Sequence, residues 1–156
     1  MENLLRIGKL KAHAADEREI LRLLDSAQLA LKDAAVADLS GDSRLNLAYR
    51  AMMQAALAAV LANGYRPSTS EPGHHQLLLQ ALPKTIGLAS ERVLVLEAFR
   101  KARNQNDYGG APVSDATATS WRWRPCCVTS ATNRPRFRRP FRSRRSRGAS
   151  RPRRPR

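Results

Sequence analysis

Cysteine, aromatic residues and long apolar runs are all scarce in this chain of 156 residues. Its only cysteines, Cys126 and Cys127, are adjacent, so they cannot cross-link distant segments, and no histidine or acid lies near them to complete a zinc site. The longest unbroken apolar run, Ala55 to Ala62, is far shorter than the roughly 20 residues that span a bilayer. Residues 1–5 lack the features of a signal peptide. We therefore expect a cytoplasmic protein with no membrane partner, no metal and no cofactor.

Charge is divided unevenly along the chain. Residues 1–120 hold 14 basic and all 13 acidic residues, whereas residues 121–156 hold 14 arginines, no lysine and no acid. The last leucine is Leu96 and the last isoleucine is Ile86, so residues 121–156 contain no aliphatic residue larger than valine. A segment so charged and so poor in aliphatics cannot offset the entropy of ordering. We expect a nearly neutral folded body, residues 1–118, and a disordered arginine-rich tail, residues 119–156.

The body has the composition and periodicity of α-helices. Leucine and alanine outnumber valine and isoleucine there, which favours helix over strand. Apolar residues recur at helical spacing over about residues 16–39 and 43–63, with Asp42 as a plausible N-cap of the second segment and Asn63–Gly64 as its C-terminal stop signal. A shorter helix over residues 74–82, ended by Pro83, and a long one over residues 91–106, capped by Ser90, follow. The prediction is an all-α, four- to five-helix up-down bundle.

The last of these helices predicts how the bundle packs. Leu94, Ala98 and Ala102, widened by Val95 and Phe99, form an apolar stripe that we expect to be buried. Residues 114–115 (SD) then resemble the cap of a further helix, but the aliphatic residues of such a helix do not follow. An exposed apolar surface is expected where that helix would pack.

Two interpretations compete for residues 121–156. As an arginine-rich arm with interspersed Trp121, Trp123, Phe137 and Phe141, the segment would bind RNA or DNA nonspecifically through Arg122 to Arg156. Alternatively, it is translated out of frame. If its arginines use CGN codons, residues 121–127 (WRWRPCC) read one base upstream encode an apolar, alanine-rich run at the place of the absent helix.

One polar face on the last long helix suggests a binding site. Arg100, Arg103, Asn104 and Asp107 are spaced i, i+3, i+4 and i+7, opposite the apolar stripe, and Tyr108 follows them. Two cations, an amide and a carboxylate on one face could hold a phosphate or orient a nucleotide. The alternative is a solvated face whose charges pair among themselves, Asp107 with Arg103.

These residues also resemble a known family. Residues 103–108 (RNQNDY) are similar to the R-N-x-x-x-H region of HEPN domains, and residues 72–75 (PGHH), 81–88 (ALPKTIGL) and 100–104 (RKARN) resemble a bacterial branch of that superfamily. The resemblance covers residues 1–118. It implies a helical bundle that is often a homodimer, and either an RNase or the partner of a nucleotidyltransferase in a toxin–antitoxin pair.

One departure from the family pattern weakens the RNase expectation. RNase members carry a histidine four to six residues beyond the arginine, whereas residues 107–110 are Asp-Tyr-Gly-Gly. The general acid–base of metal-independent RNA cleavage is therefore absent from that place, and Tyr108 is a poor substitute at neutral pH. We expect no RNase activity of the chain itself. His74 and His75 remain candidates, but adjacent helical residues point about 100° apart and should not both enter one small site.

A DNA-binding interpretation stays open beside this one. Helices at about residues 74–82 and 90–106, with Gly87 between them, have the outline of a helix-turn-helix, and Arg92, Arg100, Lys101 and Arg103 could face DNA. The expected linker, residues 83–89, is longer than the usual turn of three or four residues, and the basic residues lie late in the second helix.

Overall fold

The computed structural model describes residues 1–68 and 72–110. Its elements are, in order, α1 (Glu2–Arg6), β1 (Leu10–Ala12), α2 (Glu17–Ala34), α3 (Gly41–Ala62), β2 (Tyr65–Pro67), α4 (His74–Thr85) and α5 (Ser90–Gly109). The predicted all-α bundle is confirmed. The tail of residues 119–156, the question of its reading frame and the cap expected at residues 114–115 lie outside the described residues.

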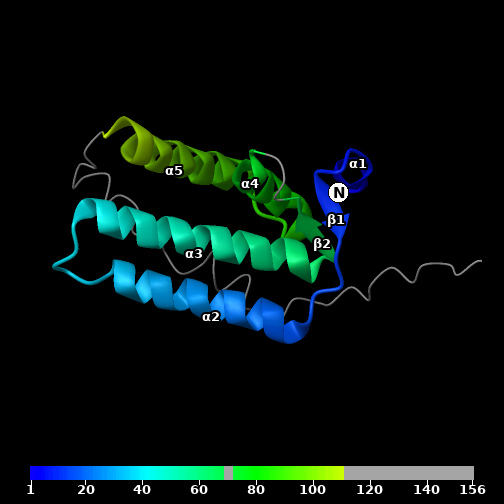
Figure 1. Cartoon of the computed structure of the whole chain (residues 1–156), viewed down its shortest axis with the longest axis horizontal. Coiled ribbons are helices and arrows are strands. Elements are labelled where there is room, and N and C mark those ends of the chain that lie inside the picture. The colour runs from blue at the N-terminus through cyan, green and yellow to red at the C-terminus, as the bar shows by residue number, and fades with distance from the viewer. Residues whose placement is uncertain (69–71, 111–156) are drawn as a thin grey trace, which may run out of the picture.

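Helix α3 is the central element of the fold. It lies between α2 on one side and the α4–α5 pair on the other, and α2 and α3 form an antiparallel hairpin (Figure 1). Helix α5 runs back along α3, so that Asn106 near its end hydrogen-bonds to Asp42 in the first turn of α3. This arrangement places the second half of α5 beside the first half of α3.

A small two-stranded sheet was not predicted. Strand β1 pairs antiparallel with β2, with Leu10 opposite Pro67 and Ala12 opposite Tyr65. Each strand has only three residues, too few to give an alternating pattern, and the two are far apart in sequence. The fully buried Leu10 anchors the ribbon to the core. The predicted stop after α3 is confirmed, because Asn63 is its C-cap and Gly64 follows with a φ of +85°.

The α2–α3 connection differs from the prediction in its details. Helix α2 ends at Ala34 rather than near residue 39. Ser40, not Asp42, caps α3, since its hydroxyl accepts the backbone N–H of Ser43 at 3.2 Å. Arg44 then donates to three backbone carbonyls of the connection, at 3.2–3.4 Å: those of Val36, Ala37 and Leu39. These bonds satisfy carbonyls that follow the helix end and hold the turn against α3.

Helix α4 is longer than expected. Pro83 lies inside it, and the helix continues to Thr85, whose hydroxyl donates to the carbonyl of Ala81 at 3.1 Å. The linker to α5 is therefore only residues 86–89, and Ala89 rather than Ser90 is the N-cap of α5. One of the objections to a helix-turn-helix, the long linker, is removed by this extension.

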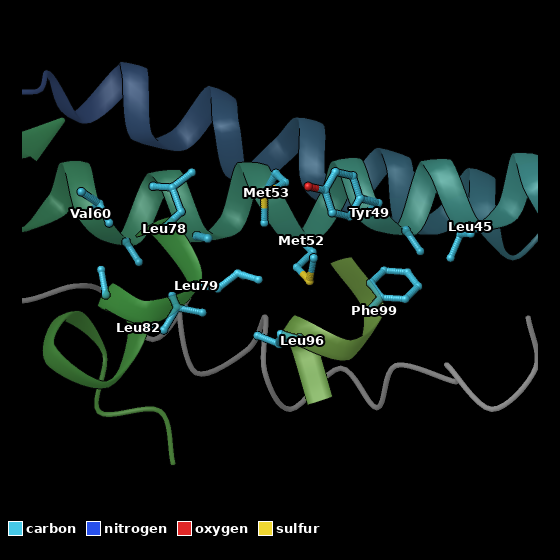
Figure 2. Packing of buried hydrophobic residues seen from close by; sticks show 14 of the residues in the cluster. Leu45, Tyr49, Met52, Met53, Val60, Leu78, Leu79, Leu82, Leu96 and Phe99 are labelled. Carbon is cyan, nitrogen blue, oxygen red and sulfur yellow. The ribbon is translucent and has the colours of Figure 1, made fainter. Parts of the chain in front are cut away.

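The core lies mainly between α3 and the α4–α5 pair. Figure 2 shows Tyr49 and Met52 on α3 facing Phe99 and Leu96 on α5, with the leucines of α4 beside them. The contact between α2 and α3 is built instead from small residues and a few aliphatics: Ile20, Leu24, Ala27, Ala30, Ala51, Ala58 and Leu61.

Of the apolar stripe predicted to bury α5, Phe99 is buried as expected, but Leu94, Val95 and Ala98 face outward. Phe99 is fully buried and Leu96 nearly so, whereas Leu94 is 70% and Val95 is 53% exposed. Helix α5 has apolar residues on two faces. The face with the bulky Phe99 packs inward, because an aromatic ring offers more area to bury than Ala98 and Ala102 do. The prediction was right that polar residues lie opposite the stripe, but that polar face is the one turned toward α3.

Among the described residues, α3 alone is long and apolar enough to cross a membrane by length and composition. Its best window has a mean hydropathy of 1.3, and 61% of that window is buried inside the fold. A buried core helix passes the same test, so this finding is weak evidence for a span. The sequence-based criterion of an unbroken apolar run missed it because Arg50 and Gln54 interrupt the helix.

Candidate functional site

Tyr49 joins three helices in one polar cluster. Its ring is buried on α3, and its hydroxyl lies 2.8 Å from Nδ1 of His75 at the start of α4. The two rings meet edge to face with centroids 5.7 Å apart, and Phe99 of α5 packs on the same tyrosine with centroids 6.4 Å apart. The cluster therefore has an apolar floor and one partly buried hydroxyl–imidazole hydrogen bond.

Arg103 closes the cluster from α5. Its guanidinium carbon lies 5.0 Å from the centroid of the Tyr49 ring, a cation–π distance. Its Nε donates to Oδ1 of Asn46 at 3.3 Å, and its Nη2 pairs with Asp107 at 2.6 Å. The pairing of Arg103 with Asp107 is the one anticipated for a face whose charges neutralise each other. A phosphate approaching Arg103 would have to compete with that carboxylate.

A second ion pair lies one turn earlier on α5. Nε of Arg100 lies 2.9 Å from Oε2 of Glu97, and both side chains are mostly buried. The other carboxylate oxygen, Oε1 of Glu97, is buried and has no hydrogen-bond partner among the described residues. This pair extends the cluster beside the Tyr49–His75 bond. Arg100 and Arg103 both affect the pKa values of Tyr49 and His75.

Burial and charge shift the pKa values of Tyr49 and His75 in opposite directions. Burial lowers the pKa of His75 below its ordinary 6.5, and the nearby His74, Arg103 and Arg100 lower it further. Burial raises the pKa of Tyr49 above 10.0, against the opposing effect of the same arginines. At neutral pH the imidazole is therefore neutral and the phenol protonated. One hydrogen bond joins the two side chains, and the imidazole tautomer decides which of them is the donor.

His74 takes part only at the edge of the cluster. Its ring meets that of His75 edge to face, with centroids 4.3 Å apart, although the two residues are adjacent on a helix. His74 also lines a separate cavity of about 250 Å³ at the start of α4, together with Lys9, Ser68, Gly73, Gln76 and Gln80. Only His75 bonds to Tyr49, although the rings of the two histidines contact each other.

The structure therefore brings together three of the predicted site residues directly and separates others. His75 and Arg103 meet through Tyr49, and Asp107 is held by Arg103. Arg100 belongs to the adjacent ion pair with Glu97. Asn104 is half-buried on α5 without a hydrogen bond to the cluster, and Tyr108 is 86% exposed beyond it.

Tyr49, Asn46 and Glu97 were not predicted from the sequence as members of the cluster. Tyr49 sits in the middle of a helix full of alanine and methionine, where a single aromatic residue is typical of a core position. A weak signal was present: Asn46, Tyr49 and Arg50 interrupt the apolar composition of that helix at helical spacing. Among the described residues, no group of three or more His, Cys, Asp or Glu could hold a metal ion.

Comparisons with known proteins give the chain no relatives. No family model, no curated protein and no solved structure matches it.

Proposed function

We propose that the chain is a HEPN-like helical module in nucleotide or nucleic-acid metabolism that acts through a partner protein and binds a phosphate group at the Tyr49–His75–Arg103 cluster. The observation that carries this proposal is the convergence of the three side chains from α3, α4 and α5. A neutral imidazole, a phenol and a guanidinium offer three hydrogen-bond donors or acceptors suited to a phosphate. Groups whose pKa values are shifted, as those of Tyr49 and His75 are, are enriched at functional sites.

The internal ion pairs limit the positive charge that the cluster offers to a phosphate. Arg103 is neutralised by Asp107 and Arg100 by Glu97, so the cluster carries no strong excess of positive charge. Phosphate binding would release Asp107 from Arg103 and exchange one anion for another. Because the acid–base histidine of the HEPN pattern is absent after Arg103, the proposal includes no RNase activity of the chain alone.

The site is tested with small ligands rather than with a long polyanion, because a polyanion would also bind the arginine-rich tail. The full chain is titrated with inorganic phosphate and with AMP while the ring protons of His75 are followed by NMR. AMP should shift these signals and raise the pKa of His75, since an anion stabilises the imidazolium. Arg103→Gln should weaken binding about tenfold or more, and Asp107→Asn should tighten it, because the competing carboxylate is gone.

Arg50→Gln is the matched control, since Arg50 is an exposed arginine on α3 away from the cluster's bonds. Binding that is equally sensitive to Arg50→Gln and Arg103→Gln would contradict the site. A separate assay measures the cleavage of single-stranded RNA. If the wild type cleaves it and His75→Gln does not, the chain is an RNase whose base is His75. That result would overturn the claim that the chain alone has no RNase activity.

The partner is tested independently. A nucleotidyltransferase encoded beside this chain, which copurifies with it and is inhibited or activated by it, would support the toxin–antitoxin form of the proposal. If the cluster binds AMP but no such enzyme associates with the chain, only the partner is overturned.

Residues 121–156 supply a second, nonspecific contact with RNA or DNA in this proposal. Their 14 arginines predict binding whose affinity falls steeply as salt rises. A chain truncated after residue 118 should lose most of that binding and most of its salt dependence. Equal affinity and equal salt slope for the truncated chain would place the contact in the body instead.

The helix-turn-helix alternative gains one observation. The four-residue linker 86–89, with Gly87 at a φ of +70°, has the length of such a turn. The first half of α5 would then enter the major groove, but its outward side chains include the exposed Leu94 and Val95, while Arg100 and Arg103 turn toward α3. Sequence-specific DNA footprints that are lost in Arg92→Gln and retained in Arg103→Gln would favour this alternative.

A further inference from the structure

The cavity of about 250 Å³ lies where the end of the β1–β2 ribbon meets the start of α4. Lys9 and Ser68 line its ribbon side, and they extend the strand pairing by one residue, because the backbone N–H of Ser68 donates to the carbonyl of Lys9 at 3.0 Å. The other side consists of one face of α4 and the two residues before it: Pro72, Gly73, His74, Gln76, Leu77 and Gln80. Among the lining residues that the structure describes, most carry polar side chains and none is acidic.

Three cations lie along the outward face of the ribbon, beside this cavity. Side chains alternate along a strand, so Lys9 and Lys11 lie on the face opposite to the buried Leu10, and Arg66 is the cross-strand partner of Lys11. All three cations are exposed, and none forms an ion pair with another described residue. Like charges directly opposite each other destabilise a sheet. The pair of Lys11 and Arg66 therefore costs the chain stability that a bound anion would restore.

The lining of the cavity suits a ligand that carries hydroxyl groups as well as an anion. The side-chain amides of Gln76 and Gln80 each donate and accept hydrogen bonds, as the hydroxyl groups of a sugar do. The cavity is smaller than the roughly 300–1,000 Å³ that pockets for drug-sized ligands occupy, so one sugar ring suits it better than a whole nucleotide. Gly73, which also lines it, is the N-cap of α4, and the positive end of that helix adds to the attraction for an anion.

From these observations we infer that the cavity binds a small phosphorylated sugar, with the sugar hydroxyl groups against Gln76 and Gln80 and the phosphate toward Lys9, Lys11 and Arg66. This site goes beyond the proposed function and does not depend on it, because Tyr49, His75 and Arg103 do not line the cavity. The two sites meet at His74, which lines the cavity and whose ring contacts that of His75.

Three small probes test the ligand class. Ribose 5-phosphate, inorganic phosphate and ribose are titrated separately into the full chain, and the ring signals of His74 are followed by NMR. Ribose 5-phosphate should bind about tenfold more tightly than inorganic phosphate, because only its hydroxyl groups reach the two amides. Ribose should cause no shift at the same concentrations, since it lacks the charge. Equal affinities for ribose 5-phosphate and inorganic phosphate would overturn the sugar specificity, and no shift with any probe would overturn the site.

Substitutions test where the probe binds. Lys9→Gln should weaken the binding of ribose 5-phosphate about tenfold, since it removes the cation that lines the cavity. Lys84→Gln is the matched control, because Lys84 is an exposed lysine in the last turn of α4 and does not line the cavity. Equal weakening by the two variants would overturn the site. Binding that Arg103→Gln weakens and Lys9→Gln does not would also overturn it, while it would support the Tyr49–His75–Arg103 cluster as the phosphate site.

Arg66→Gln separates ligand binding from folding. Without ligand this variant should melt at a higher temperature than the wild type, because the repulsion between Lys11 and Arg66 is gone. Ribose 5-phosphate should nevertheless raise its melting temperature less than it raises that of the wild type, because one contact with the phosphate is lost. A residue with only a structural role would give the opposite sign in the first measurement. A free variant that melts below the wild type, or an unchanged effect of the ligand, would overturn the role of Arg66.

Discussion

The two faces of α3 differ in what packs on them. Toward α2 the contact consists of small residues and a few aliphatic ones, with Ala27, Ala30 and Ala51 buried together. Toward α4 and α5 it consists of large side chains around Phe99 and Tyr49, and polar groups reach into it. Small residues let helix backbones approach closely, whereas large ones hold the helices further apart and leave space that polar side chains can occupy. The first face holds the hairpin together, and the second can also carry chemistry.

Even the polar bonds of the two faces differ in kind. The α2 face has one bond between uncharged groups, in which Nε2 of Gln54 donates to the hydroxyl of Ser26 at 2.8 Å. The α5 face has an imidazole, a phenol and two guanidinium groups within one cluster. The following substitutions test whether the faces differ in energy and in response to pH as this comparison implies.

Removing Phe99 should have the largest effect. Phe99→Ala deletes a fully buried ring that contacts Tyr49, and a loss of about 3–5 kcal/mol in the free energy of unfolding is typical of such a cavity. Urea unfolding followed by circular dichroism measures it. The conservative Phe99→Leu should cost much less, and equal losses for both would show that the ring itself fills no specific space.

Enlarging the α2 face should cost less but still be clear. Ala27→Leu adds a branched side chain where the alanine is fully buried between α2 and α3, and overpacking of this kind costs about 1–3 kcal/mol. The neighbouring Gln28→Leu places the same side chain on the exposed side of α2 and serves as the control. If both variants unfold at the same urea concentration, the hairpin contact is looser than the structure indicates.

Deleting one hydroxyl should have a smaller effect that is confined to the polar cluster. Tyr49→Phe keeps the ring on Phe99 and removes the bond to His75, which should cost about 1 kcal/mol in unfolding free energy. Double-mutant analysis with His75→Gln measures the coupling between the two residues. Additive effects of the two substitutions would contradict a hydrogen bond between them.

The smallest effect concerns pH. Because the pKa of His75 is lowered in the fold relative to its ordinary 6.5, the unfolded chain takes up a proton more readily. The stabilisation is complete above about pH 6.5, and the free energy of unfolding should fall as the pH is lowered from 7 toward 5. His75→Gln should flatten this dependence. An NMR titration midpoint for His75 above 6.5 would reverse the predicted sign.

Local patterns in the sequence predicted most of the helical scaffold. The helical periodicity of apolar residues predicted α2 and α3, and Asn63–Gly64 predicted the end of α3. Both signals depend on residues within a few turns of one another. The inward face of α5 could not be predicted in this way. That helix has two apolar faces, and only contact with Tyr49 and the leucines of α4 decides which one is buried.

The candidate site was predicted in part for the same reason. The polar face of α5 follows from the spacing of Arg100, Arg103 and Asp107, all on one element. That His75 would meet Arg103 does not follow from spacing, since the two belong to different helices and are joined by a third residue, Tyr49. The β1–β2 ribbon escaped prediction because its pairing is entirely nonlocal.

That ribbon also constrains the order in which the chain can fold. Since β1 precedes α2 and β2 follows α3, their pairing closes a loop that contains the whole α2–α3 hairpin. Closing a long unstructured loop is entropically costly, whereas closing it after the hairpin has formed is not, because the hairpin already returns the chain to its starting point. Hairpin formation before strand pairing is then the order with the smaller entropic cost.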